Sequence, residues 1–335
     1  MGRPDNLGKA IRSHCSLEFE LSDSMAGPSS PSSGTQGRAI LNPYPTTTIE
    51  YQYRDLEQCI RGIESAATSF TDGSRADGSW IVFYGVDEHA FDEIRNSDHE
   101  LLTICTKFFD QNAEVLVLKM ESLWHSTTSM AVARWIDRKA HAMNVESELL
   151  FTGTAHYKLP QFDDNGLPVV AEGTLQMIQK RADQVIHSFA VSPPRRTKWP
   201  TFVLEVIYTE ARFRVEQDMR LWLQATQGQV EFVMTVSVQP RTKRITLEQW
   251  GLRHEPTKDH PDRVIAEPVQ IMWIEKPQSS GQDHIIDGSF EIPFRSLFLR
   301  DPEGNEDGFF MTHEDITRLA RDIWRVDAIL AAENE

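Results

Sequence analysis

TFVLEVIY, residues 201–208, is the stretch of the sequence that decides the fold. Its β-branched and aromatic residues are typical of a β-strand. Because successive side chains of a strand point to opposite faces, one face carries Phe202, Leu204, Val206 and Tyr208 and the other carries Val203, Glu205 and Ile207. Glu205 is thus an acid within an apolar strand. A buried carboxylate is costly unless it is paired, hydrogen-bonded or bound to a metal, so Glu205 needs a partner.

Asp183 is the first candidate partner of Glu205. It lies just past a strand expected at residues 174–178, and neighbouring strands lie ~4.8 Å apart. Two converging carboxylates form an oxygen-ligand site suited to Mg²⁺ or Mn²⁺, which can polarise a phosphodiester. The alternative is an ion pair between Glu205 and Arg212 or Arg214, which would attach the following helix to the sheet. Spacing alone leaves both interpretations open.

Hydrophobic periodicity on either side of residues 201–208 predicts a mixed sheet flanked by helices. Amphipathic helices are expected over residues 53–67, 127–144, 211–226 and 316–330, the last of them capped by Thr312 and Asp315. Strands are expected over residues 80–84, 101–109, 115–120, 174–178, 201–208, 230–238 and 244–250, and within 148–158, with 101–109 and 115–120 as a hairpin. From residue 127 the order is helix, three strands, helix and two strands. This order indicates an α/β protein without the strict alternation of a doubly wound fold.

The composition predicts an acidic folded domain that follows a disordered leader. Lys and Arg number 34 against 50 Asp and Glu, a formal charge of −16, which argues against a generally basic nucleic-acid coat. Residues 22–48 are rich in Ser, Pro and Gly, so we expect a disordered leader over 1–48 and a single domain with terminal elaborations over 49–335. No apolar run approaches the ~18 residues of a membrane span, so we expect no membrane partner and an intracellular location, nuclear or cytoplasmic.

Cysteines and tryptophans have modest structural roles in this interpretation. The scattered cysteines offer no disulfide framework and no CxxC pair for zinc, so Cys59 and Cys105 are expected to be buried reduced thiols. Trp222 and Trp250 could stack on bases, but they belong to the apolar faces of predicted elements. Core packing is therefore the prediction for both tryptophans.

Five stretches of the chain carry a resemblance to a known family. They are KRADQ at 180–184, WPTFVLEV at 199–206, RVEQDMRLWL at 214–223, VEFVMTVSV at 230–238 and ITLEQW at 245–250. In their order and spacing they resemble a group of fungal proteins of the restriction-endonuclease-like PD-(D/E)XK superfamily, and the similarity extends upstream to MESLWH at 120–125 and downstream to LFLRDP at 297–302. The resemblance implies a restriction-endonuclease-like fold, an Mg- or Mn-dependent nuclease, and Asp183 with Glu205 as its metal-binding pair.

The chain departs from the family pattern at three positions. Ile207 occupies the slot two residues after the glutamate, where the superfamily has a lysine that stabilises charge at the phosphate. The fungal group commonly lacks this lysine, so the resemblance assigns its role to the nearest cations, Arg212 and Arg214. Arg181 stands where the fungal motif has a glutamate, and Ser126 stands where an acid follows the histidine. These changes leave open a catalytically inactive protein that keeps the fold as a binding or interaction module.

A basic middle section qualifies the acidic balance. Residues 180–244 contain eleven Lys and Arg against six Asp and Glu, and both flanking regions are acidic. We therefore expect any nucleic-acid partner to bind through region 180–244. The alternative is that the acidic flanks neutralise this region. A weaker alternative is a protein-interaction domain whose leader recruits partners, and nothing in the sequence indicates an oligomeric state.

Overall fold

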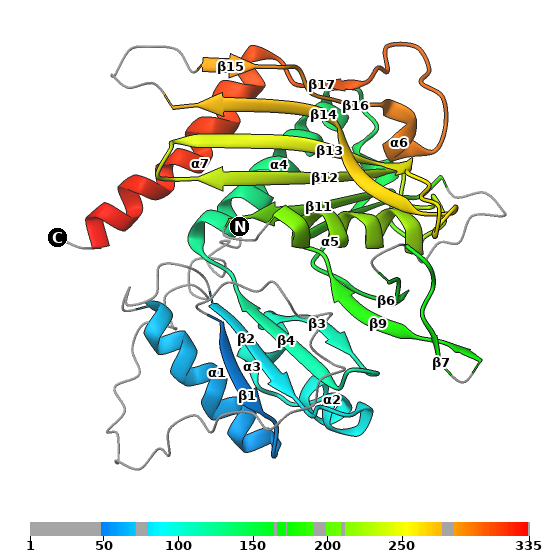
Figure 1. Cartoon of the computed structure of the whole chain (residues 1–335). Helices are drawn as coiled ribbons and strands as arrows, with labels where there is room; N and C mark the ends of the chain where they lie inside the picture. The colour runs from blue at the N-terminus through cyan, green and yellow to red at the C-terminus, as the bar shows by residue number, and fades with distance from the viewer. Residues whose placement is uncertain are drawn as a thin grey trace. The chain divides into compact units, whose positions relative to one another are not determined.

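The computed structural model describes residues 48–71, 79–163, 166–171, 173–190, 199–208, 212–276 and 285–333. All of them belong to the compact unit Gln36–Glu335. The described residues form a mixed α/β protein with two large sheets (Figure 1). Its helices are α1 (Leu56–Thr71), α2 (Glu88–Arg95), α3 (Glu100–Cys105), α4 (Leu123–Ala142), α5 (Arg212–Ala225), α6 (Phe294–Phe298) and α7 (His313–Glu333). The expected leader lies outside the described residues except for residue 48, so it stays a prediction.

The first sheet has six strands in the order β1-β2-β4-β3-β9-β6 among the described residues. These strands are β1 (Ile49–Gln52), β2 (Ser79–Tyr84), β3 (Thr106–Asp110), β4 (Val115–Met120), β6 (His156–Pro160) and β9 (Met177–Arg181). β1 and β2 are parallel, and the other neighbours are antiparallel. One face packs against α1, α2 and α3 around a core that includes Ile63, Phe91 and Leu116.

The second sheet has seven strands in the order β15-β14-β13-β12-β11-β10-β5 within the described part of the chain. These strands are β5 (Leu149–Gly153), β10 (Gln184–Ser188), β11 (Phe202–Ile207), β12 (Phe232–Gln239), β13 (Arg244–His254), β14 (Val264–Glu275) and β15 (Ile285–Asp287). β11 and β12 are parallel, and the remaining pairs are antiparallel. Two short ribbons complete the strands, with β7 (Val170–Ala171) on β8 (Thr174–Leu175) and β16 (Glu291–Ile292) on β17 (Phe309–Phe310).

The two faces of β11 match the alternation expected from the sequence. Phe202, Leu204 and Val206 belong to the core that also contains the buried faces of α4 and α7. Val203 belongs to the opposite core, which contains α5 residues and side chains of both sheets, and Ile207 packs against it. Glu205 therefore points into the region where α5 and the two large sheets meet.

The chain between α4 and α5 differs from the prediction of three strands. Seven strands, β5 to β11, occupy the described part of this segment. β9 is close to the expected strand at 174–178, but it pairs with β3 and β6 in the first sheet rather than with β11. The strand of this segment that does pair with β11 is β10, where no strand was expected. Likewise, the run 101–109 is not one hairpin strand, because its first half is the helix α3.

Several local predictions are confirmed. Thr312 Oγ1 accepts a hydrogen bond from Asp315 N at 3.3 Å, while Asp315 Oδ2 accepts one from Thr312 N at 3.1 Å, so the expected box caps α7. Cys59 and Cys105 are buried free thiols, and burial raises the pKa of each to about 12. Trp222 and Trp250 are 0% and 2% exposed and pack in the core as expected.

Candidate functional site

Asp183 lies at the point where the chain passes from one large sheet to the other. It follows β9 of the six-stranded sheet and directly precedes β10 of the seven-stranded sheet. Its backbone N–H donates to Leu204 O at 3.2 Å, and its carboxylate Oδ2 accepts from Val206 N at 2.7 Å. These bonds fasten Asp183 to β11 on either side of Glu205, so the two predicted acids do converge. The convergence comes from β10 and not, as expected, from a neighbouring β9.

Lys107 of β3 connects the two predicted acids. Its ammonium donates to Asp183 Oδ1 and, at 2.8 Å, to Glu205 Oε2. The structure therefore places a lysine of the other sheet between the carboxylates, in the position where a metal ion was expected. Region 201–208 itself contains no lysine or arginine.

The second oxygen of Glu205 is also occupied. Trp222 Nε1 of α5 donates to Glu205 Oε1 at 2.8 Å, and Lys180 Nζ lies 3.3 Å from the same oxygen. Lys180 also pairs with Asp218 Oδ2 at 2.9 Å. Glu205 thus has a charged or hydrogen-bonding partner for each oxygen, as a buried carboxylate requires.

We call Lys107, His125, Lys180, Asp183 and Glu205 the buried charge cluster. Each of these residues is less than a tenth exposed. Burial alone would raise the pKa of Asp183, but His125 and Lys107 outweigh it and hold that pKa well below its usual value. Burial alone would lower the pKa of Lys107, but Asp183 and Glu205 outweigh it and raise that pKa. The pair therefore stays ionised despite its burial.

His125 and Glu121 extend the cluster toward solvent. His125 lies in the first turn of α4, where its backbone N–H donates to the capping Ser122 Oγ at 3.3 Å, and its Nε2 lies 2.9 Å from Asp183 Oδ2. Its Nδ1 lies 3.5 Å from Glu121 Oε2 but makes no hydrogen bond. Glu121, His125 and Asp183 present ligand atoms within 4.8 Å of one another, so this group could hold a metal ion. The Glu121 side chain is 26% exposed and gives the group its contact with solvent.

Arg212 and Arg214 contact acids other than Glu205, and their expected catalytic role stays a prediction. Arg212 Nη1 donates to both oxygens of Glu248, at 2.8 and 2.9 Å. Arg214 Nε lies 3.3 Å from Asp218 Oδ1. Neither arginine pairs with Glu205, whose cationic contacts come from the two strand lysines. Lys107 and Lys180 reach Glu205 because their strands, β3 and β9, lie across the core from β11. The distance in sequence between Glu205 and the arginines of α5 does not reveal this arrangement.

The sequence contained a usable signal for Lys107. It interrupts the apolar run ICTKFF at 104–109, so the cost argument applied to Glu205 holds for this lysine as well. Glu121 lies inside the segment MESLWH at 120–125, whereas the family resemblance predicts an acid at position 126. Ser126 is exposed there, and the acid near His125 is instead the residue four positions earlier. Ile207 packs against the core beside α5, and Arg181 donates to the carbonyl oxygen of Ile104.

The described cations of the basic region 180–244 are mostly engaged within the protein. Those that contact an acid or a backbone carbonyl are Lys180, Arg181, Arg212, Arg214, Arg220, Lys243 and Arg244. Three more cations fall at residues 195–198, outside the described residues. Nucleic-acid contact through this region therefore stays a prediction.

Comparison with known proteins does not assign the chain to a family. The sequence matches no protein-family model, and no curated protein matches it. None of the described helices combines the length and apolar character that crossing a membrane requires.

Proposed function

We propose that this protein is a metal-dependent phosphodiester hydrolase of nucleic acid with a restriction-endonuclease-like fold. One observation carries the proposal: Asp183 and Glu205 share the ammonium of Lys107 beside the Glu121–His125–Asp183 group. Two acids, a lysine and a metal-holding group form the set of functions that such hydrolysis needs. The mixed sheet with its parallel pair of β11 and β12 is consistent with the fold proposed.

The residues present fit a divalent cation at Glu121, His125 and Asp183. The imidazole of His125 lies between the two carboxylates, with Nε2 2.9 Å from Asp183 Oδ2 and Nδ1 3.5 Å from Glu121 Oε2. One imidazole and two carboxylates suit Mn²⁺ better than Mg²⁺, because Mg²⁺ prefers oxygen ligands alone. A divalent cation bound there would supply Lewis-acid polarisation of the phosphodiester.

The chain's own residues would orient and balance this site. Lys107 bonds to both carboxylates and keeps them together, and its ammonium would stabilise negative charge that develops on a phosphate. Val206 N–H fixes one Asp183 oxygen, and Trp222 fixes one Glu205 oxygen. These bonds hold the acids in place before any substrate binds.

A second candidate is a catalytically inactive protein that keeps this fold as a binding or interaction module. The observation that favours it is burial: the carboxylates of Asp183 and Glu205 are 2% and 4% exposed, and each has partners on both oxygens. In this case Lys107 replaces the metal ion as the counter-charge, and the cluster serves stability alone.

Nuclease and metal-binding assays separate the two candidates. The full chain is incubated with plasmid DNA, single-stranded DNA and RNA in Mn²⁺ or Mg²⁺, beside Asp183→Asn and the control Asp301→Asn, whose carboxylate is 80% exposed and pairs with Arg295. The hydrolase proposal predicts that the wild type and Asp301→Asn cleave these substrates and that Asp183→Asn does not.

Calorimetry with Mn²⁺ gives a readout that does not depend on cleavage. The hydrolase proposal predicts binding that His125→Gln abolishes. If the wild type cuts none of the substrates and takes up no Mn²⁺, the inactive module is the correct description.

A further inference from the structure

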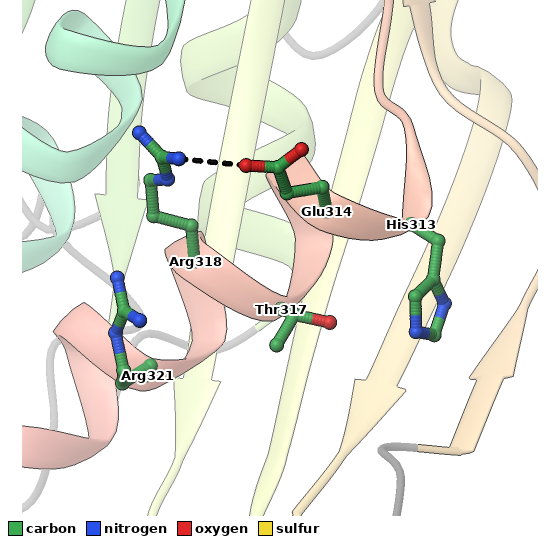
Figure 2. A pocket seen from close by; sticks show the side chains of 5 residues that line it. All are labelled: His313, Glu314, Thr317, Arg318 and Arg321. Carbon is green, nitrogen blue, oxygen red and sulfur yellow. Dashed lines mark hydrogen bonds and ion pairs between the residues drawn. The ribbon is translucent and has the colours of Figure 1, made fainter.

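Two packed helices, α4 and α7, present arginines on their outer sides. α4 carries Arg134 and Arg138, and α7 carries Arg318, Arg321 and Arg325. We call these five residues the arginine face. Arg318 and Arg321 also line a hollow of about 310 Å³ on α7, where they extend from the same side of the helix (Figure 2). The hollow's other lining residues are His313, Glu314 and Thr317.

Helical spacing makes the arginines of α7 a row. Residues three or four apart lie on one side of a helix, so Arg318, Arg321 and Arg325 follow one another along α7. At about 1.5 Å per residue the row is roughly 10 Å long. A nucleic-acid duplex carries one phosphate per strand for about every 3.4 Å along its axis, so the row matches the charge spacing of about three nucleotides.

Acidic side chains on the two helices neutralise the arginine face only in part. Glu314 pairs with Arg318 at 2.8 Å. Asp322 is shared by Arg321 and Arg325 at 3.7 and 3.5 Å, beyond good hydrogen-bond distance. On α4, Arg134 and Arg138 form no ion pair or hydrogen bond within the described residues, although the exposed Asp137 lies on the same helix. Asp315, the remaining acid near the face, is held by Lys139 at 2.9 Å.

The electrostatics of Arg138 indicate a surplus of positive charge. Burial lowers the pKa of Arg138, and the neighbouring Arg318 and Arg134 lower it further, while Asp315 and Asp322 compensate only partly. Arg138 stays charged, but its charge is not fully compensated by the acids around it. An anion placed on this face would relieve that repulsion.

We infer that the arginine face binds the phosphate backbone of a nucleic acid. The inference names the substrate-binding surface of the proposed hydrolase and rests on that proposal for the choice of nucleic acid. Guanidinium groups suit phosphate because their planar donors bind two oxygens at once. α4 relates this face to the site: it carries His125 in its first turn and Arg134 two and a half turns, about 13 Å, further along its axis on the opposite, exposed side. The surface also explains how a chain of net charge −16 can engage a polyanion locally.

Binding measured without metal tests the arginine face. Fluorescence anisotropy in EDTA follows labelled single-stranded and duplex oligonucleotides on the full chain and on the triple variant Arg138→Gln, Arg318→Gln, Arg321→Gln. We expect the variant to bind about tenfold or more weakly, and the slope of log affinity against log salt to fall by about 2 for single strands, at roughly 0.7 per phosphate contact.

A matched triple variant controls for the change in net charge. Arg61→Gln, Arg95→Gln and Arg295→Gln remove three exposed arginines, each paired with a nearby acid, from α1, α2 and α6. We expect this control to bind oligonucleotides as the wild type does. Equal weakening in both triples, unchanged binding in the first, or no binding by the wild type would overturn the inference. Binding to anionic lipid vesicles but not to oligonucleotides would overturn it as well.

These results are independent of the cleavage assay. Selective loss of binding in the first triple supports the arginine face even when no substrate is cut, in which case only the hydrolase proposal fails. Cleavage by the wild type combined with unchanged binding of the first triple refutes the arginine face alone.

Discussion

Replacing Lys107 by methionine removes the ammonium that Asp183 and Glu205 share and leaves an apolar side chain of similar length. Removing one partner of a buried ion pair costs about 3–5 kcal/mol, because the remaining charge stays buried. Two hydrogen bonds to charged groups, at about 1.5–3 kcal/mol each, give a similar sum. Lys180 still lies 3.3 Å from Glu205 and His125 still lies 2.9 Å from Asp183, but neither replaces the ammonium that both carboxylates share. We therefore expect Lys107→Met to lower the free energy of unfolding by about 3–5 kcal/mol.

Urea unfolding followed by tryptophan fluorescence, in EDTA, measures this loss. The matched control is Lys158→Met on β6, an exposed lysine whose replacement should change the free energy of unfolding by less than about 0.5 kcal/mol. A double-mutant cycle with Asp183→Asn assigns the loss to the pair, because Lys107→Met should cost much less once Asp183 is neutral. A cost below about 1 kcal/mol, the value of a surface ion pair, would refute the buried pair as a stabilising contact. So would an equal cost in both backgrounds.

Two further predictions use other contacts. Trp222→Phe removes a hydrogen-bond donor to the charged Glu205, so it should lower the free energy of unfolding in urea by about 1.5–3 kcal/mol beyond the effect of the smaller ring. The control Trp250→Phe loses the same ring volume and a hydrogen bond to the neutral hydroxyl of Thr235, worth about 0.5–1.5 kcal/mol. An equal or larger cost for Trp250→Phe would contradict this prediction. Hydrogen bonds from Arg300 lower the pKa of Glu306 from 4.5 to about 2, so this contact stabilises the fold above pH 4.5 and is lost as the pH falls toward 2. Glu306→Gln should therefore be destabilised at about pH 6 and less so at about pH 3 in urea unfolding, and a difference independent of pH would contradict it.

Local periodicity was the dependable part of the sequence. The alternation of residues 201–208 correctly separated Leu204 from Glu205, because the two-residue period of a strand depends on neighbouring residues alone. The same holds for the Thr312 cap, which spans three positions. The elements α4, α5 and α7 were likewise found with small errors at their ends.

Pairing between distant strands was the part that the sequence did not reveal. Lys107 lies 76 residues before Asp183 and 98 before Glu205, and no local pattern states that β3 and β11 face one core. Asp183 was placed near Glu205 for the wrong reason, because the five residues of β10 were too short and too mixed to stand out as a strand. Arg212 and Arg214 of α5 were expected beside Glu205 because they are near it in sequence, yet they pair with Glu248 and Asp218.

The position of Asp183 at the crossing between the two sheets has a consequence for folding. Its bond to Lys107 of β3, like that of Glu205, joins the two sheets, and these two contacts close loops of 76 and 98 residues, so we expect them to form late in folding. Contacts that close late are weak in the transition state and strong in the native state. We therefore expect the buried charge cluster to slow unfolding and to contribute little to the rate of folding.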